Sequence, residues 1–323
     1  MGLDSCVKTH LRKHAPAAFY YHPSLGNLYS ERPYDAVIVD MNVELFRKPP
    51  HITTGGEWAE YIFRARVKSP PGDVIVLLFD SPPFVPATKD MTHLKRSSTG
   101  AKRKRFVPLD SSTVFGDKIE LPEWSRVTGT KSILPLLWSY LIDALRRISV
   151  SHPDFNKTFY VDTPLCVRHM PLSKFMNGKI HCLNRSQSTV VGTPEHRFGE
   201  GDLKTLAWVS FLRTEHNYKD ILVWSTDLDN IGMFAKPDMI GVDLIGNTVC
   251  VNATNTVVPK KEATKKVYEV IGLGKIACIF GDYSKLFRTI LVMGTTDFNT
   301  SVDCITTDRM IKTFFEKRAR NLN

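Results

Sequence analysis

The sequence lacks several patterns that identify common classes of protein. Its six cysteines, spread over 323 residues, never form a CxxC pair, so neither a zinc site nor a disulfide framework is predicted. Neither GxxxxGK[ST] nor GxGxxG occurs, which argues against a kinase or a nucleotide-driven motor. No run reaches the ~18 apolar residues of a membrane span, and the N-terminus lacks an apolar signal region. We therefore expect an intracellular protein with no membrane partner.

Acidic residues are fewer than basic ones. The chain has 43 Lys and Arg against 33 Asp and Glu, which gives a formal net charge of +10 and a pI near 9.3. This balance favours an anionic partner, of which nucleic acid is the commonest inside a cell. The 42% of hydrophobic residues is enough to bury a substantial core, either as one large α/β domain or as a domain with insertions.

Two apolar runs near the N-terminus each end in an acid. Residues 36–39 precede Asp40, and residues 74–79 precede Asp80. Apolar residues at helical spacing lie between the two runs, so the order predicts a parallel strand pair joined by a right-handed crossover. Ligands collect at the carboxyl edge of such sheets, and both acids are expected at that edge.

Further acids occupy comparable places later in the chain. Glu200 and Asp202 open a predicted helix, while Asp227 and Asp229 follow the predicted strand 221–224. Asp297 follows a predicted helix and Gly294. Carboxylates gathered at one place repel one another unless cations neutralise them, and hard oxygen ligands suit Mg²⁺ or Mn²⁺. Any one of these acids is more often a solvated loop residue, but seven at element ends predict a metal site.

Basic residues crowd the stretch after Asp80, where residues 102–105 read Lys-Arg-Lys-Arg. One interpretation is a solvated loop or a nuclear-import signal, and the other is a phosphate-binding segment beside the cation site. Elsewhere, residues 133–148 predict an amphipathic core helix, and residues 242–251 predict a hairpin that turns at Gly246-Asn247. Residues 310–323 predict a basic amphipathic helix.

The acids and their neighbours follow a recognisable order along the chain. The motifs are Met1-Gly2, Asp40, Phe79-Asp80 with a basic stretch behind it, Gly199-Glu200-Gly201-Asp202-Leu203-Lys204, Ser225-Thr226-Asp227-Leu228-Asp229 and Gly294-Thr295-Thr296-Asp297-Phe298. In this order the sequence resembles the flap endonuclease family, which belongs to the five-prime nucleases with a PIN-like domain. The Gly-Glu-Gly-acid-x-Lys motif is most similar to that of the five-prime exoribonucleases. As a compact, divergent member of this kind, the sequence also resembles the nucleases that large DNA viruses encode.

The resemblance implies a PIN-like α/β fold over residues 1–299, with a mostly parallel central β-sheet flanked by helices. A basic arch-like insertion is expected at about 81–130, and a reduced C-terminal helical element at 300–323. Two Mg²⁺ ions, for which Mn²⁺ can substitute, are expected on Asp40, Asp80, Glu200, Asp202, Asp227, Asp229 and Asp297. Lys89 and Arg96, seven positions apart, correspond to a basic pair that engages the scissile phosphate.

The sequence departs from the family pattern at two places. Asp202 stands where a second Glu is usual, which shortens its reach by one methylene. No glycine-rich hairpin for gripping duplex follows Asp297. The resemblance implies a nuclease acting on DNA five-prime ends, flaps or breaks in replication, repair or recombination, with replication or repair proteins as partners. The expected location is the nucleus or a viral replication site. An endoribonuclease of the host-shutoff type and a non-catalytic nucleic-acid-binding scaffold remain the alternatives.

Overall fold

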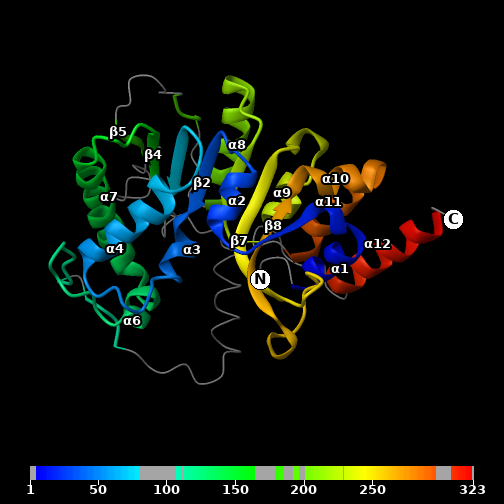
Figure 1. The fold of residues 1–323 in the computed structure, drawn as a ribbon, viewed down its shortest axis with the longest axis horizontal. Coiled ribbons are helices and arrows are strands. Elements are labelled where there is room, and N and C mark those ends of the chain that lie inside the picture. Colours follow the sequence, from blue (N-terminus) through cyan, green and yellow to red (C-terminus); the bar gives the residue numbers. More distant parts are fainter. Residues whose placement is uncertain are drawn as a thin grey trace. The chain divides into compact units, whose positions relative to one another are not determined.

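The computed structural model of this chain describes residues 5–79, 107–110, 112–163, 179–184, 192–195, 201–227, 229–295 and 307–321 (Figure 1). The described residues separate into two compact units. The described residues between 34 and 218 form one, which we call the mid-chain unit. Residues 5–33 and those from 219 onward form the other, the terminal unit. Each unit contains strands with helices packed beside them, which confirms the α/β class.

The mid-chain unit carries strands in the order β2-β3-β4-β5. Strand β3 is parallel to both β2 and β4, and β5 runs antiparallel to β4. The mostly parallel sheet predicted from the sequence is therefore present in this unit. Its main elements are β2 (Ala36–Asp40), α3 (Met41–Leu45), α4 (Gly55–Ile62), β3 (Val74–Leu78), α6 (Trp124–Gly129), α7 (Leu134–Ser151), β4 (Thr158–Thr163), β5 (Lys179–Asn184) and α8 (Gly201–His216).

Local sequence explains where the helix before β3 begins. Thr54 caps α4 and forms a capping box with Glu57, whose carboxylate accepts hydrogen bonds from the backbone N–H groups of Thr53 and Thr54. The helix then continues as a π-helical segment, Phe63–Lys68. Gly72, with a φ of +98°, makes the turn into β3, a conformation that favours glycine.

Aromatic side chains fill the core beside the end of β3. Phe79 is fully buried and packs edge-on against Trp138 of α7, with ring centroids 4.9 Å apart. Trp138 in turn stacks on Trp58 of α4 at 6.1 Å. The Phe79 ring thus packs on α7, and α7 packs in turn on α4.

The second half of the predicted insertion docks on the start of α4. The Gly56 N–H donates to the Asp117 carbonyl at 3.1 Å, and the Leu121 N–H donates to the Thr53 carbonyl at 2.7 Å. A Cβ on Gly55 would lie 2.6 Å from the Gly116 carbonyl oxygen, so this close approach requires glycine. The chain thus returns from the basic stretch along a path fixed by backbone contacts.

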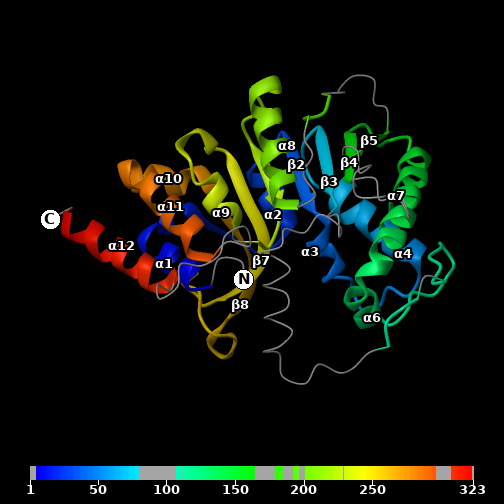
Figure 2. The ribbon, with the colours of Figure 1, turned by 180° about the vertical axis from the view of Figure 1, so that it is seen from behind.

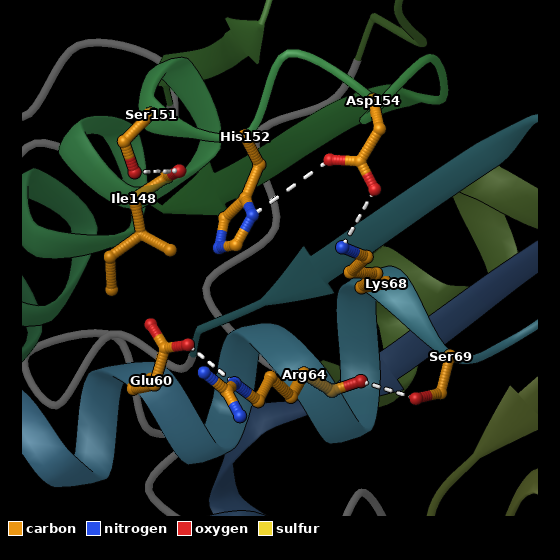
Figure 3. A network of polar contacts seen from close by, with 8 residues as sticks. All are labelled: Glu60, Arg64, Lys68, Ser69, Ile148, Ser151, His152 and Asp154. Carbon is orange, nitrogen blue, oxygen red and sulfur yellow. Dashed lines mark hydrogen bonds and ion pairs between the residues drawn. The ribbon is translucent and has the colours of Figure 1, made fainter.

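An exposed polar network lies near the N-terminal ends of β3 and β4 (Figure 3). Lys68 pairs with Asp154 at 2.9 Å, and this contact is the largest cause that lowers the pKa of the Asp154 carboxyl. Arg64 pairs with Glu60 one turn earlier, and the Ser69 hydroxyl donates to the Arg64 carbonyl. Exposed pairs of this kind contribute little to stability because water screens them. The Lys68–Asp154 pair joins the π-helical segment to the loop after α7 at the surface.

The terminal unit carries strands in the order β1-β8-β7-β6. Strands β6 and β7 are parallel, whereas β8 is antiparallel to both β7 and β1. Parallel pairing is therefore the minority in this unit. Its main elements are α1 (Ser5–His14), β1 (Phe19–His22), α2 (Leu25–Glu31), β6 (Ile221–Trp224), α9 (Asp229–Phe234), β7 (Val242–Val251), β8 (Lys265–Gly272), α10 (Leu273–Phe280), α11 (Ser284–Thr295) and α12 (Thr307–Asn321).

The hairpin predicted within residues 242–251 is wrong. These residues form the single strand β7, and its register against β8 shifts between Ile245 and Asn247. Gly246 therefore occupies a bulge rather than a turn. A Cβ at this position would lie 2.2 Å from the Ser225 carbonyl oxygen. An isolated glycine in a strand marks such a close approach of backbone, and here it admits the chain that follows β6.

The two ends of the described chain pack together in the terminal unit. Helix α1, blue in Figures 1 and 2, lies beside α12, red in the same views. The His14 ring stacks on Phe315 of α12 at 4.1 Å, and α12 also packs against α11. The helix predicted for the C-terminal tail is confirmed. Its apolar face is buried within the unit and leaves the basic face outward, as at Lys312 and Lys317.

A buried carboxylate fastens α1 to the strands. Glu269 of β8 is 1% exposed and pairs with both Lys8 and Arg12, whose Nε lies 2.6 Å from the Glu269 Oε1. Burial lowers the pKa of the Lys8 ammonium, and the charge of Glu269 opposes that effect. Two of the basic residues of α1 are thus committed to a partner inside the unit, so they do not contribute to an outward-facing basic surface.

Candidate active site

The mid-chain unit brings the carboxyl ends of three parallel strands to one edge. Asp40 of β2 lies opposite Leu78 of β3, and Leu78 lies opposite Asp162 of β4. Phe79 follows β3 directly, and its N–H donates to the Asp162 carbonyl at 3.0 Å. The predicted parallel arrangement of the first two strands is confirmed. Asp80, which comes next in the sequence, lies outside the described residues.

Asp40 forms the junction between β2 and α3. It is half-buried, and its Oδ1 accepts a hydrogen bond from the Asn42 N–H at 2.9 Å, so the side chain caps the helix. Phe46 follows α3 and is 72% exposed, an unusual environment for a large apolar ring. An acid and an exposed aromatic ring therefore flank the five residues of this short helix.

Asp202 lies in the first turn of α8. The residue is 7% exposed, and α8 packs against β2 and β3, as the view from behind shows (Figure 2). A carboxylate in this turn is stabilised by the helix dipole and by the backbone N–H groups that have no partner within the helix. The predicted helix is confirmed, and its N-terminal end is the part that carries the candidate acid. Glu200 lies outside the described residues.

A buried ion pair fastens α8 to the ends of β3 and β4. Lys204 is fully buried, and its Nζ donates to the carbonyl oxygens of Phe79 at 2.6 Å and of Asp162 at 3.2 Å. The same Nζ lies 3.4 Å from the Asp162 Oδ1. Trp208, one turn further along α8, donates from its indole Nε1 to the Asp162 Oδ2 at 2.7 Å. Two side chains of one helix face thus hold a single carboxylate.

Sequence reasoning assigned no role to Asp162 or Lys204. The signal for Asp162 was present, because Phe159-Tyr160-Val161 is an apolar run that ends in an acid, as at Asp40 and Asp80. Burial distinguishes Asp162 from Asp40. Asp162 is fully buried, and its carboxylate is occupied by Lys204 and Trp208, so it supports the edge rather than facing a ligand.

The terminal unit presents a second acidic junction, after β6. Asp227 is half-buried, and its Oδ1 accepts from the Asp229 N–H at 3.0 Å at the start of α9. The Asp227 N–H donates to the Ser225 Oγ at 3.1 Å, and the Asp227 carbonyl accepts from the Asn230 Nδ2 at 3.1 Å. Ser225, Asp229 and Asn230 are all buried. The backbone of Asp227 is therefore held on both sides by short polar side chains.

The predicted site residues divide between the two units. Asp40 and Asp202 belong to the mid-chain unit, and Asp227 and Asp229 belong to the terminal unit. Lys89, Arg96 and Asp297, like Asp80 and Glu200, lie outside the described residues. Within the part of the chain that the structure describes, no group of three or more His, Cys, Asp or Glu is close enough to hold a metal ion. Convergence of the seven acids remains a prediction.

Comparison with known proteins does not add an assignment. No protein-family model and no curated protein matches this sequence. Among the described helices, none combines the length and the apolar character needed to cross a membrane.

Proposed function

We propose that this chain is a metal-dependent nuclease that hydrolyses phosphodiester bonds of DNA at five-prime ends, flaps or breaks. The observation that carries the proposal is the construction of the mid-chain edge. Asp40 ends β2, Phe79 directly follows β3, and Lys204 of the helix that carries Asp202 donates to the Phe79 carbonyl. A buried ammonium and an aromatic cluster thus support an edge where several acids follow one another in sequence.

The donor chemistry fits hard divalent cations. Asp40, Asp202, Asp227 and Asp229 offer carboxylate oxygens, which are the ligands that Mg²⁺ and Mn²⁺ prefer. When bound, a pair of such ions would generate hydroxide from water near neutral pH and stabilise charge on the attacking and departing oxygens. Each unit would hold its own carboxylates: the mid-chain unit through the cap at Asp40 and the docking of α8, and the terminal unit through the cap at Asp227.

Charge and surface chemistry support nucleic acid as the substrate. The net charge of +10 favours a polyanion, and the exposed ring of Phe46 is suited to stack on an unpaired base. The proposal assigns to Lys89 and Arg96 contact with the scissile phosphate. It also assigns replication, repair or recombination as the setting, in the nucleus or at a viral replication site, as the family resemblance implies.

End-labelled flap, nicked and blunt duplexes in Mg²⁺, prepared in matched DNA and RNA forms, test the proposal. The Asp227→Ala variant should lose at least about a hundredfold in cleavage rate, the scale seen when a group that stabilises transition-state charge is removed. Asp238→Ala, at an exposed acid of the same unit, should cleave as the wild type does. Circular dichroism would verify that both variants fold.

The outcomes separate the three candidate functions. Cleavage of DNA in preference to RNA supports the proposal, whereas cleavage of RNA alone assigns the same chemistry to an endoribonuclease. Binding of both nucleic acids without cleavage of either identifies a scaffold. Equal cleavage by Asp227→Ala and the wild type would exclude the acidic site altogether.

A further inference from the structure

Helix α12 of the terminal unit packs against α1 and α11 (Figures 1 and 2). Acidic residues are scarce on these helices, because α1 and α11 contain no Asp or Glu and α12 contains five Lys and Arg against two acids. Exposed lysines lie on each of them, namely Lys13 of α1, Lys285 of α11, and Lys312 and Lys317 of α12. We call these four side chains the outward lysines.

The outward lysines have no partner within the described residues. None of them makes an ion pair there or donates a hydrogen bond from its ammonium group. Even Glu316, one turn after Lys312 on the same helix, does not pair with it. On α1, by contrast, Lys8 and Arg12 pair with the buried Glu269. That helix thus neutralises its inward cations and leaves its outward lysine unpaired.

Basic residues on helical segments of the mid-chain unit are arranged differently. Four of them pair with acids at the surface: Arg64 with Glu60, Lys68 with Asp154, Arg146 with Asp143, and Arg147 with Asp117. Such pairs contribute little to stability, but each neutralises charge locally. Unpaired like charges on adjoining helices repel one another, and an anion from outside relieves that repulsion. The outward lysines are therefore available to an external anion.

The buried face of α12 argues against a lipid surface as that anion. A basic amphipathic helix that lies on a membrane places its apolar face in the lipid. In α12 this face is already occupied, because Ile311, Phe314 and Phe315 are buried. Phe315 stacks on His14 of α1, and the Phe314 ring centroid lies 5.5 Å from that of Phe287 of α11. The outward side of α12 can thus attract a partner only through its charge.

The chemistry of the outward lysines fits the phosphate backbone of nucleic acid. Lysine is depleted in protein–protein interfaces, which argues against an acidic protein as the partner. A lysine ammonium acts as a point charge on a flexible stem, whereas the planar guanidinium of arginine recognises its partners by geometry. Contacts with phosphate position a nucleic acid without reading its sequence. Exposed lysines on adjoining helices complement a polymer that carries a negative charge on every nucleotide.

We propose that the outward lysines form a surface that holds the phosphate backbone of nucleic acid, independently of base sequence and of any metal ion. The inference rests on nucleic acid as the substrate class of the proposed function and adds to it a holding surface in the terminal unit. It does not depend on the predicted metal site, so it is testable under conditions in which the chain cannot cleave.

Binding in EDTA tests the inference. Fluorescence anisotropy of two labelled DNA duplexes of unrelated sequence, measured from about 50 to 200 mM salt, gives the affinity and its salt slope. Lys312→Gln/Lys317→Gln should lower the slope by about two units for both duplexes, one for each lost phosphate contact. The wild type should then lose about tenfold more affinity than this variant over the same salt range. Lys13→Gln/Lys285→Gln should act in the same direction.

Matched variants separate the place of a charge from the net charge of the chain. Arg64→Gln/Lys68→Gln also removes two positive charges, but both belong to ion pairs of the mid-chain unit, so the salt slope should equal that of the wild type. Lys312→Arg/Lys317→Arg keeps the charge and should bind as the wild type does. Glutamine and lysine have similar helix propensity, and circular dichroism would verify that each variant folds.

Several results would overturn the inference. If Lys312→Gln/Lys317→Gln keeps the wild-type slope, these side chains are solvated lysines that serve solubility alone. If Arg64→Gln/Lys68→Gln lowers the slope equally, the effect belongs to net charge. An effect on one duplex sequence and not on the other would indicate contact with bases. Binding to vesicles of phosphatidylserine and phosphatidylcholine that needs the lysines, with DNA binding unchanged, would identify a lipid surface instead.

Failure of this inference is distinguishable from failure of the proposed function. Cleavage by the wild type, together with a salt slope that the outward lysines do not affect, contradicts the holding surface alone. Binding in EDTA that depends on the outward lysines, together with no cleavage in Mg²⁺, contradicts the nuclease and leaves the holding surface in place.

Discussion

The two units build the same kind of junction by different means. In each, an acid at or shortly after the end of a parallel strand accepts at its Oδ1 from the N–H two residues later, at 2.9 Å for Asp40, the last residue of β2, and at 3.0 Å for Asp227, three residues after β6. Both acids are half-buried and both precede a helix. Such caps are local and are encoded by neighbouring residues. What supports each cap differs.

The junction at Asp40 depends on a contact distant in sequence. Glu44, one turn further along α3, is fully buried, and its Oε1 accepts from the Arg66 Nε at 2.8 Å. Arg66 comes from the π-helical segment after α4. The junction at Asp227 depends instead on Ser225 and Asn230, and on the space that Gly246 leaves. The junction at Asp40 is thus supported by an ion pair from another helix, whereas the junction at Asp227 is supported by neighbouring side chains and by one close backbone approach from β7.

Breaking the distant contact should have the largest effect. The Arg66→Met variant leaves the Glu44 carboxylate buried without its cation, which costs about 3 to 5 kcal/mol for buried pairs. Urea unfolding of the purified chain measures the change in the free energy of unfolding. Arg64→Met, which removes the exposed pair with Glu60, is the control and should leave the midpoint unchanged. Equal losses in the two variants would contradict the coupling of Asp40 to its unit.

Filling the space beside the second junction should have an intermediate effect. In Gly246→Ala, the new Cβ would meet the Ser225 carbonyl oxygen at 2.2 Å, so the loop or β7 must move. Overpacking of this kind costs about 1 to 3 kcal/mol. The displacement should also lower cleavage, because Asp227 follows Ser225 by two residues.

A control for that substitution lies in the same unit. Gly26→Ala, in α2, places its Cβ 3.7 Å from the nearest atom, the Ser24 Oγ, which is an ordinary contact. This variant should be as stable as the wild type or slightly more so, since alanine favours helix. If Gly246→Ala unfolds at the same urea concentration as Gly26→Ala, the bulge does not hold the loop.

Removal of one local hydrogen bond should have the smallest effect. Ser225→Ala takes away the acceptor of the Asp227 N–H, a loss of about 1 kcal/mol. Ser225→Ala should lower the cleavage rate by more than its small loss of stability would explain, because the Ser225 Oγ orients Asp227, a proposed site residue. Ser30→Ala, at an exposed serine that bonds only within α2, should change neither quantity. A cleavage rate equal to that of the wild type would show that Ser225 does not orient Asp227.

The sequence predicted elements where the determining interactions are close along the chain. The apolar runs before Asp40 and Asp227 predicted β2 and β6, the amphipathic patterns predicted α7 and α12, and the acids at 200 and 202 predicted the start of α8. The hairpin at Gly246-Asn247 was wrong because the glycine serves a contact with Ser225, which is distant in sequence. A local pattern cannot distinguish a glycine that turns the chain from one that admits another segment of backbone.

The sequence by itself determined which acids follow apolar runs or open helices, and it determined the excess of positive charge. Both follow from residue identity and short-range periodicity. Only the tertiary structure decided which of the strand-ending acids is buried. Asp162 and Asp40 end similar apolar runs, yet Asp162 is enclosed by Lys204 and Trp208 of a helix more than forty residues away. The physical reason is that burial and pairing of a charge depend on what packs against it, and that partner comes from a distant part of the chain.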